Sequence, residues 1–293
     1  MSVLVTGASG FIGKELLISN ISSYVTRCTM HINPIDNFSG DIFPISELNE
    51  NTDWTGAFDN ISTVIHLAGI AHKPKTKKQD YYNVNTKGAK KLALESAISG
   101  VKKFIYISSI KVSDRKHVDD QTKSQRLAEK EILEVGAKFG MVVVIIRSSL
   151  VYGVNPPANM GLLFKMVDKL PVLPFGTVMN KMNFISIYNL LDLIYYCVTS
   201  ELADDKLLLC NDGKQVSIRF LTNEIAFSLG KSIFQIPISV ATLSFVLNFL
   251  GKSSVSEILL GNSLIEQNEF NLLDGWNPPF TMRDSMLKIS KRN

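Results

Sequence analysis

The chain has 293 residues, of which 45% are hydrophobic and 20% charged, a composition that is ordinary for folded proteins and excludes broad disorder. Its formal net charge of +4 is small and its lysines are dispersed, so nucleic acid is not expected as a partner. The densest basic run, residues 73–78, is interpreted as a solvated loop.

The first residues of the chain predict a dinucleotide site. A short β-branched strand runs into a turn with glycine at Gly7, Gly10 and Gly13, and a helix follows from Lys14. Glycine at these offsets lets the backbone turn tightly and approach a pyrophosphate, while the helix N-terminus offers free N–H groups. Spaced glycines alone are a weak signal. Their place between a strand and a helix is what predicts dinucleotide binding.

Apolar strand-like runs alternate with helical patterns through the first half of the chain. Residues 64–67 and 104–107 are short apolar runs, and a helical stretch lies between them at residues 82–99. Residues 141–146 are continuously apolar, which is typical of a strand in a parallel sheet covered by helices on both faces. The pattern predicts an α/β fold with a doubly wound parallel sheet of the Rossmann type.

The sequence pattern changes after Gly153, where prolines divide the chain into predicted loops and short helices. We therefore predict a dinucleotide-binding domain over residues 1–153, to which residues 184–210 return. Residues 154–293 are predicted to form a smaller, mostly helical substrate-binding lobe. Ligands of such sheets bind beyond the carboxyl ends of the strands, so this lobe is expected to cover the site.

The longest apolar stretch, residues 233–250, is interrupted by polar residues and a proline, so no membrane span is predicted. We interpret it as a buried helix that begins near Ser239, with an interfacial membrane helix as the alternative. Cys28, Cys197 and Cys210 show no paired spacing and are expected to be buried thiols in a reducing compartment. Because the first strand begins at once, no leader is expected, and the predicted location is cytoplasmic.

Together these motifs resemble the extended short-chain dehydrogenase/reductases of the NAD-dependent epimerase/dehydratase family. Within that family they are most similar to nucleotide-sugar 4-epimerases and 4-keto reductases of bacterial surface-polysaccharide pathways. The likeness rests on residues 6–13, 66–69, 147–153, 260–264 and 274–279 and spans nearly the whole chain. It implies a nucleotide-diphosphate sugar as substrate and hydride transfer at the sugar C4.

The resemblance also implies where the cofactor is held. The Asp41-Ile42 pair falls where the family contacts the adenine, and residues 67–69 fall on the strand end beneath the cofactor. The second strand, expected over residues 26–32, ends without the acid that favours NAD or the arginine that favours NADP. NAD is the expected cofactor and NADP the alternative. The implied cofactor residues are Thr6, Gly7, Gly10, Phe11, Ile12, Gly13, His31, Asp41, Ile42, Leu67, Ala68, Gly69 and Asn85.

The family's chemistry depends on a serine and a Tyr-x-x-x-Lys pair. Ser109 takes the place of the serine, whereas Gln121 and Gln125 stand where the tyrosine and the lysine are expected. A glutamine amide does not ionise near neutral pH, and loss of a positioned acid/base removes about 10²–10⁴ of rate. His72 is the candidate substitute, because an imidazole pKa suits proton transfer.

Substrate contacts implied by the resemblance are Ser149, Asn159 and Lys181. Met182 replaces the arginine with which the family usually grips the diphosphate. No group of His, Cys, Asp and Glu has metal-site spacing, so no metal is expected.

Two hypotheses follow. The chain is an NAD(P)-dependent sugar-nucleotide 4-epimerase or 4-keto reductase, or it is a catalytically impaired dinucleotide-binding protein that acts as a sensor, scaffold or partner subunit. The resemblance further implies a homodimer that pairs through two long helices, expected at residues 82–99 and 122–139.

Overall fold

The computed structural model describes residues 1–31, 38–71, 76–114, 119–249, 251, 256, 259–263, 265, 273 and 275–292. The chain divides into two compact units, between which it passes repeatedly. Unit 1 comprises Met1–Ser148, Leu191–Cys210 and Asn271–Trp276. Unit 2 comprises Ser149–Leu190, Asn211–Phe270 and Asn277–Asn293.

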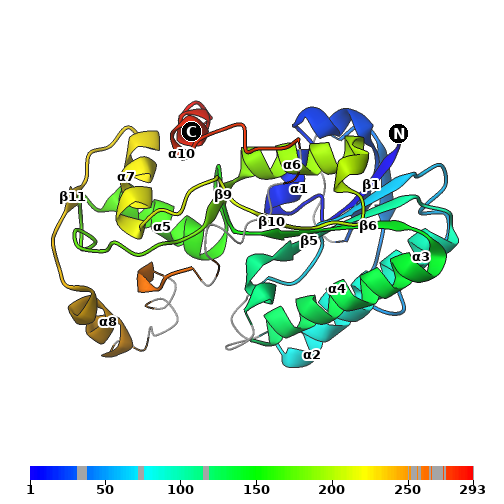
Figure 1. Cartoon of the computed structure of the whole chain (residues 1–293), viewed down its shortest axis with the longest axis horizontal. Coiled ribbons are helices and arrows are strands. Elements are labelled where there is room, and N and C mark those ends of the chain that lie inside the picture. The colour runs from blue at the N-terminus through cyan, green and yellow to red at the C-terminus, as the bar shows by residue number, and fades with distance from the viewer. Residues whose placement is uncertain are drawn as a thin grey trace. The chain divides into compact units, whose positions relative to one another are not determined.

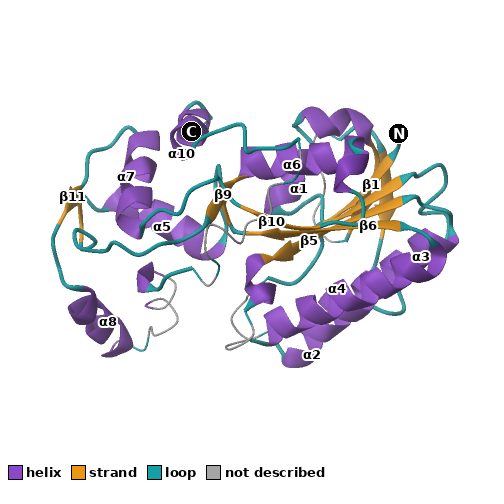
Figure 2. Cartoon of the chain, viewed as in Figure 1, coloured by secondary structure: helices purple, strands orange, loops and turns teal. Residues whose placement is uncertain are grey.

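Unit 1 is built on a seven-stranded sheet in which all neighbouring strands run parallel (Figure 2). The strand order is β10-β6-β5-β4-β1-β2-β3. The order reverses between β1 and β4, which is the position where doubly wound sheets bind dinucleotides. The predicted α/β fold is confirmed. The strands are β1 (Val3–Thr6), β2 (Val25–Met30), β3 (Asp41–Pro44), β4 (Thr63–His66), β5 (Lys103–Ser109), β6 (Val142–Ser148) and β10 (Leu207–Cys210).

Helices cover both faces of this sheet. In Figure 1, α2, α3 and α4 lie along one face, while α1 and α6 lie along the other. The core against α3 and α4 contains Leu92, Phe104 and Ile132, none of which is exposed. Burial on both faces explains why the strands are continuously apolar. The helical elements are α1 (Phe11–Leu16), η1 (Asn20–Tyr24), α2 (Lys78–Tyr81), the π-helical η2 (Tyr82–Gly88), α3 (Ala89–Ile98), η3 (Ile110–Ser113), α4 (Asp120–Phe139), α6 (Ile187–Thr199) and η4 (Glu201–Ala203).

Unit 2 is mostly helical. Its two small sheets each hold two parallel strands, β7 with β9 and β8 with β11. The helices α5, α7 and α10 share an apolar core that includes Phe164, Leu221 and Met286. The described elements of unit 2 are β7 (Leu150–Tyr152), α5 (Ala158–Lys169), β8 (Val172–Leu173), β9 (Phe184–Ser186), α7 (Ile218–Ser228), β11 (Phe234–Gln235), α8 (Val240–Phe249) and α10 (Met282–Ser290).

The unit boundaries differ from those predicted. The first unit ends at Ser148 rather than at residue 153, and the returning segment is Leu191–Cys210 rather than residues 184–210. Pairing of β7 with β9 is the physical reason, because it keeps both of these segments in unit 2. The second strand ends at Met30, two residues before its predicted end.

The helix expected near Ser239 is present as α8, but none of its ten residues is buried, so the prediction of a buried helix is wrong. Among the described residues, no helix has both the length and the apolar character needed to cross a membrane. Cys28, Cys197 and Cys210 are all free and buried, which confirms the expected burial of the three thiols.

Candidate functional site

The carboxyl ends of β1, β4 and β5 gather most of the predicted cofactor residues at one edge of unit 1. Thr6, His66 and Tyr106 are aligned across the three strands. The carboxyl ends of parallel strands meet at the same edge of a sheet, so the loops that follow them adjoin. These loops begin at Gly7, after β1, and at Leu67, after β4, while Ser109 ends β5.

The glycine turn is closely packed on one side and open on the other. Gly7 has φ +75°, and a Cβ there would lie 2.7 Å from the Ala68 nitrogen. A Cβ on Gly13 would lie 2.3 Å from the Gly7 oxygen, whereas one on Gly10 would meet only that oxygen, at 3.1 Å. Gly10 precedes α1, whose first N–H groups, from Phe11 on, have no acceptor within the helix. The open side of this turn therefore suits an anion such as a pyrophosphate.

A buried pair beneath the turn links β1 to the loop after β4. Thr6 Oγ1 lies 2.6 Å from His66 Nδ1, and the Ala68 N–H donates to the same hydroxyl at 3.4 Å. The His66 ring stacks on Tyr106 at 5.5 Å between centroids. Burial lowers the pKa of His66 to about 3, so this histidine is neutral in the folded chain. Thr6 is fully buried and acts on the site by holding the loop.

Asn85 holds the same loop from the other side. Its Oδ1 accepts from the Ile70 N–H at 2.7 Å, and its Nδ2 donates to the Ile70 oxygen and to Ser124 Oγ, both at 3.2 Å. Ser124 Oγ in turn donates to the Gln121 oxygen at 2.7 Å. Asn85 lies in the π-helical η2, a distortion that is frequent at functional sites. These bonds make Asn85 a positioning residue, which ties the loop at residues 67–70 to α4.

The predicted contacts on β2 and β3 are placed differently. His31 follows β2 and is exposed at the carboxyl edge. Asp41 and Ile42 open β3, where Asp41 is level with Arg27 of β2 and Leu4 of β1. Arg27 Nη2 pairs with the Asp41 carboxylate at 3.1 Å. The structure therefore does not bring Asp41 and Ile42 to the carboxyl edge, because β3 begins at this pair rather than ending there.

Ser109 is the predicted catalytic serine. It ends β5 and caps the short helix η3, its Oγ accepting from the Lys111 N–H at 3.3 Å. The Arg126 guanidinium of α4 donates to the carbonyl of Val112, at 2.8 Å from Nη2, and to that of Asp114. Arg126, which sequence reasoning missed, thus ties residues 112–114 to α4.

Gln121 and Gln125 lie one turn apart at the start of α4. Asp119 caps this helix by accepting from the Thr122 N–H at 2.7 Å. Both glutamines are half-buried, and Gln125 Oε1 is a buried atom with no hydrogen-bond partner among the described residues. Neither amide takes up or releases a proton near neutral pH. The proposed substitute, His72, lies outside the described residues.

One turn further along α4, the Glu129 side chain points toward the sheet. Its carboxylate receives two donors from Arg147 of β6, Nη2 at 2.5 Å and Nε at 3.0 Å. Arg147 Nη1 also donates to Ser113 Oγ at 3.1 Å. The Glu129–Arg147 pair therefore joins α4, β6 and the end of η3. Burial and the nearby Glu129 charge both raise the pKa of Tyr106.

The predicted substrate residues all belong to unit 2. Asn159 is exposed near the start of α5, and Ser149 is buried beside β7. Lys181 is exposed, and its N–H donates to Asn262 Oδ1 at 2.8 Å. Met182, where the family has an arginine, is buried in the core of unit 2. Its side chain stabilises that core and offers no charge to a diphosphate.

A half-buried carboxylate that sequence reasoning missed lies in unit 2. Asp212 Oδ2 accepts from Tyr152 Oη at 2.6 Å, and Oδ1 accepts from the Ser186 N–H at 2.9 Å and from Asn189 Nδ2 at 2.7 Å. Burial raises the pKa of Asp212, and burial followed by the Asp212 charge raises that of Tyr152. Tyr152 has no exposed surface, so it does not replace the tyrosine missing from α4.

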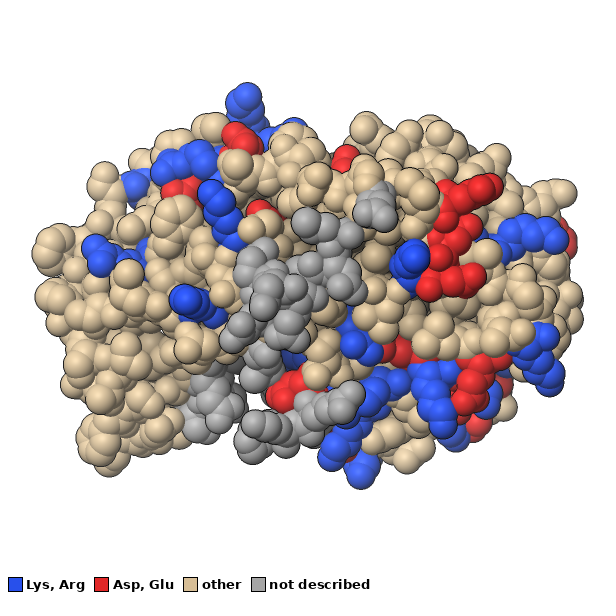
Figure 3. All heavy atoms as spheres, in the orientation of Figure 1, with Lys and Arg blue, Asp and Glu red and all other residues tan. Residues whose placement is uncertain are grey.

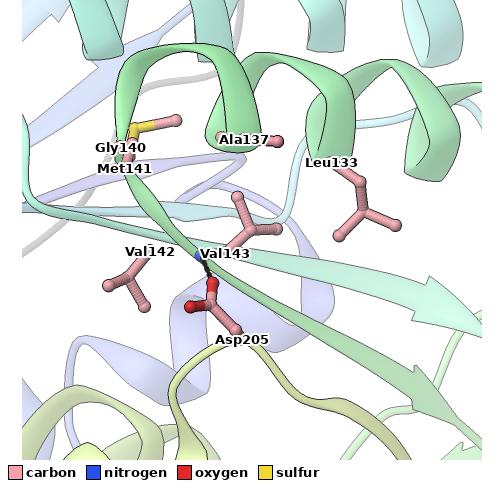
Figure 4. Close-up of a pocket in the computed structure, with 8 residues that line it drawn as sticks. Leu133, Ala137, Gly140, Met141, Val142, Val143 and Asp205 are labelled. Atoms are coloured by element: carbon pink, nitrogen blue, oxygen red, sulfur yellow. Dashed lines mark hydrogen bonds between the residues drawn. The ribbon is translucent and has the colours of Figure 1, made fainter.

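A pocket of about 350 Å³ lies elsewhere in unit 1, at the amino end of β6 (Figure 4). Apolar and small residues line it, among them Leu133, Ala137 and Met141. Its carboxylate, Asp205, accepts from the Val143 N–H at 3.0 Å. With that carboxylate engaged and no second acid or base, the pocket does not qualify as the catalytic site. Among the described residues no group of His, Cys, Asp or Glu is arranged to hold a metal ion.

Comparisons with known proteins agree with this geometry. Residues 3–206 match the model of the NAD dependent epimerase/dehydratase family. The chain is 33% identical to UDP-glucose 4-epimerase of Vibrio cholerae, over 99% of this chain and 94% of that protein. It is 24% identical to N-acetyl-alpha-D-glucosaminyl-diphospho-ditrans,octacis-undecaprenol 4-epimerase of Escherichia coli O157:H7, over 79% of this chain and 73% of that protein.

The fold is also shared with solved structures. The structure of UDP-N-acetylglucosamine 4-epimerase from Bacillus cereus superimposes with a TM-score of 0.78 at 14% identity, over 100% of this chain and 99% of that one. With a family model that matches most of the chain and a relative alignable over nearly its full length, the conclusion is direct. The chain belongs to the NAD dependent epimerase/dehydratase family.

Proposed function

We propose that unit 1 binds NAD along the carboxyl edge of β1, β4 and β5. Two features fit a dinucleotide. The open side of Gly10 and the free N–H groups of α1 suit the pyrophosphate. Gln125 Oε1, buried and without a partner in the described part of the chain, needs a donor such as a ribose hydroxyl. NADP remains the alternative, because no acidic residue stands at Met30 or His31, where β2 ends.

The proposed substrate is a nucleotide-diphosphate sugar, and the proposed reaction is reversible oxidation at the sugar C4. Support comes from the 4-epimerase relatives, two of which are named for UDP-sugars and one for a lipid-diphosphate sugar. Ser109, at the end of β5, would hydrogen-bond the reacting oxygen. From unit 2, Ser149, Asn159 and Lys181 are proposed to bind the sugar nucleotide.

Proton transfer is proposed to limit this reaction. When bound, NAD supplies the hydride acceptor and donor, so the protein must take up the hydroxyl proton and return it. Gln121 and Gln125 do neither, and each missing acid/base group costs about 10²–10⁴ in rate. The single observation that carries this proposal is the position of these two glutamines on α4. Gln125 lies one turn before Glu129, which pairs with Arg147, and Gln121 lies one turn before Gln125.

The second candidate function is binding without turnover, as a sensor, scaffold or partner subunit. The glutamine pair and the buried, Asp212-bound Tyr152 favour it, while the similarity to UDP-glucose 4-epimerase over nearly the whole chain favours turnover. Both candidates need NAD binding, so they differ only in catalysis.

The test compares the wild type with a Gln121→Tyr/Gln125→Lys variant. Each is incubated with NAD and either UDP-glucose or UDP-N-acetylglucosamine, and the anomeric proton signals are followed by NMR. Slow epimerisation by the wild type, with at least a hundredfold gain in the variant, supports impaired catalysis. Gain in the variant but none in the wild type supports the binding function. Fast turnover by the wild type would contradict both, because another group would then move the proton.

Two controls separate catalysis from binding. Ser109→Ala in the Tyr/Lys background should remove most of the gained activity while NAD affinity, measured by calorimetry, stays the same. Titration with NAD and NADP decides the cofactor. If neither binds the wild type, the proposal for the carboxyl edge fails whatever the NMR shows.

Pairing of two copies through α3 and α4 stays a prediction. On α4, Leu127 and Leu133 are apolar and exposed. Analytical ultracentrifugation should show a dimer at micromolar concentration, which Leu127→Lys/Leu133→Lys should dissociate. A wild type that sediments as a monomer would contradict it.

A further inference from the structure

Helix α8 of unit 2 lies in a long uncharged stretch of the sequence. Residues 232–251 contain no Lys, Arg, Asp or Glu. One face of the helix is attached to unit 2. Leu243, Ser244 and Leu247 are half-buried, and Leu243 packs against the unit 2 core. Ser256 Oγ donates to Ser244 Oγ at 3.1 Å. This attached face accounts for only part of the apolar surface of the helix.

The opposite face is equally apolar. Phe245, Val246 and Phe249 are 71%, 46% and 83% exposed, and the two phenylalanine rings stack with centroids 6.5 Å apart. A helix packed on one side normally presents polar residues on the other. In Figure 3 the surface at the place of α8, at the lower left, shows no charged side chain. This face, defined by Phe245, Val246 and Phe249, is termed the α8 outer face.

The size of the α8 outer face limits what kind of partner can cover it. A ten-residue helix is about 15 Å long and about 10 Å wide, so half of its side offers on the order of 250 Å². Stable protein interfaces bury about 800 Å² on each partner. The outer face is too small for such an interface. Its size is sufficient for an interfacial helix, whose apolar side enters a bilayer by about 5–10 Å without needing a shaped partner.

Charge points to the same occupant. Unit 1 has as many basic as acidic residues, so the whole net charge of +4 belongs to unit 2, which carries α8. Lys231 and Lys252 bracket the uncharged stretch in the sequence, and the Lys231 ammonium is paired with Asp168 at 2.5 Å. Anionic headgroups attract a basic unit, and this attraction adds to the burial of aromatic rings.

We propose that the α8 outer face inserts into the headgroup region of a bilayer that contains anionic phospholipid, and so holds unit 2 at a membrane surface. This goes beyond the proposed reaction and is independent of whether the chain turns over a sugar.

The experiment is flotation of the full chain with vesicles of phosphatidylglycerol and phosphatidylethanolamine. The wild type should float with the vesicles. Phe245→Ser/Phe249→Ser should lower the partition coefficient about a hundredfold, since each ring contributes about tenfold. Phe139→Ser is the matched control, because Phe139 is an exposed phenylalanine of unit 1, and it should float like the wild type. Both α8 positions are exposed, so melting temperature should not change.

Phe249→Trp gives a second readout that does not depend on removing a ring. Its emission should shift to shorter wavelength when these vesicles are added. The proposal is overturned if the wild type stays in the aqueous fraction, or if the double serine variant floats equally well. It is also overturned if sedimentation shows self-association that this variant abolishes, because a second copy would then cover the face.

Discussion

Removing the charge of Arg147 tests how unit 1 supports helix α4, which carries Gln121 and Gln125. Arg147 Nη2 and Nε lie 2.5 and 3.0 Å from the Glu129 carboxylate, whose side chain is only 4% exposed, against 18% for the arginine. At about 3 Å and an effective dielectric constant of about 20, such a pair interacts by about 5 kcal/mol. Arg147→Met leaves the Glu129 charge buried without a partner, so the free energy of unfolding should fall by about 3–5 kcal/mol.

Urea unfolding followed by tryptophan fluorescence measures this loss. Trp54 and Trp276 both belong to unit 1 and are buried, so their emission reports on the unit that holds the pair. The double variant Glu129→Leu/Arg147→Met carries no buried charge and should recover most of the lost stability. Lys130→Ala is the control, since its pair with Glu134 spans 3.7 Å between exposed side chains and should not matter.

The reasoning would be refuted if the single and the double variant lost equal stability. In that case the two side chains would contribute by packing alone, without electrostatic coupling. A loss below about 1 kcal/mol for Arg147→Met would likewise place this pair with ordinary surface ion pairs.

Three further outcomes are expected. Gly13→Ala should lower the free energy of unfolding by about 1–3 kcal/mol and weaken NAD binding, because its Cβ would meet the Gly7 oxygen at 2.3 Å; thermal melting with and without NAD checks both. Burial lowers the pKa of His66 to about 3 against about 6.5 unfolded, so the unfolded chain binds the extra proton and stability falls as pH drops below about 6.5. His66→Phe should flatten this dependence in urea unfolding at pH 5 and 7.5. Burial raises the pKa of Asp212, so the contribution of this carboxyl group to stability falls as pH rises above about 3.9. Asp212→Asn should remove that loss of stability and keep Tyr152 hydrogen-bonded. Hydrogen exchange in unit 2 would measure both effects.

The parts of unit 1 that sequence reasoning predicted well are those dictated by local chemistry. The glycine turn is one, because the spacing of Gly7, Gly10 and Gly13 between a strand and a helix leaves few alternatives. The parallel sheet is another, since a run as apolar as residues 142–146 needs helices on both faces. Gln121 and Gln125 were assigned to the tyrosine and lysine positions from the likeness of Ser124 and Glu129 to the family's helix, and the structure does place them on a helix, α4.

What sequence reasoning missed depends on contacts between distant segments. Tyr152 and Asp212 are sixty residues apart, and no local pattern marks either as a member of a buried network. The place of Asp41 at the start of β3 is one example, because the register of β3 is set by pairing with β2, not by the Asp-Ile motif itself. Helix α8 was predicted to be buried because its stretch is apolar but too interrupted to span a membrane, whereas composition does not say whether the rest of the protein covers such a helix.

The late return of the chain to unit 1 has a consequence for biosynthesis. Strand β6 pairs with β5 on one side and with β10 on the other, and β10 is made only after residues 149–206. At about 5–20 residues per second, the ribosome needs about 3–12 s to add them. During that interval the nascent sheet presents β6, one of its most apolar strands, as an open edge of the kind that templates aggregation. The few residues of β10 therefore complete the nucleotide-binding sheet. By covering the edge of β6, they also protect the new chain from self-association.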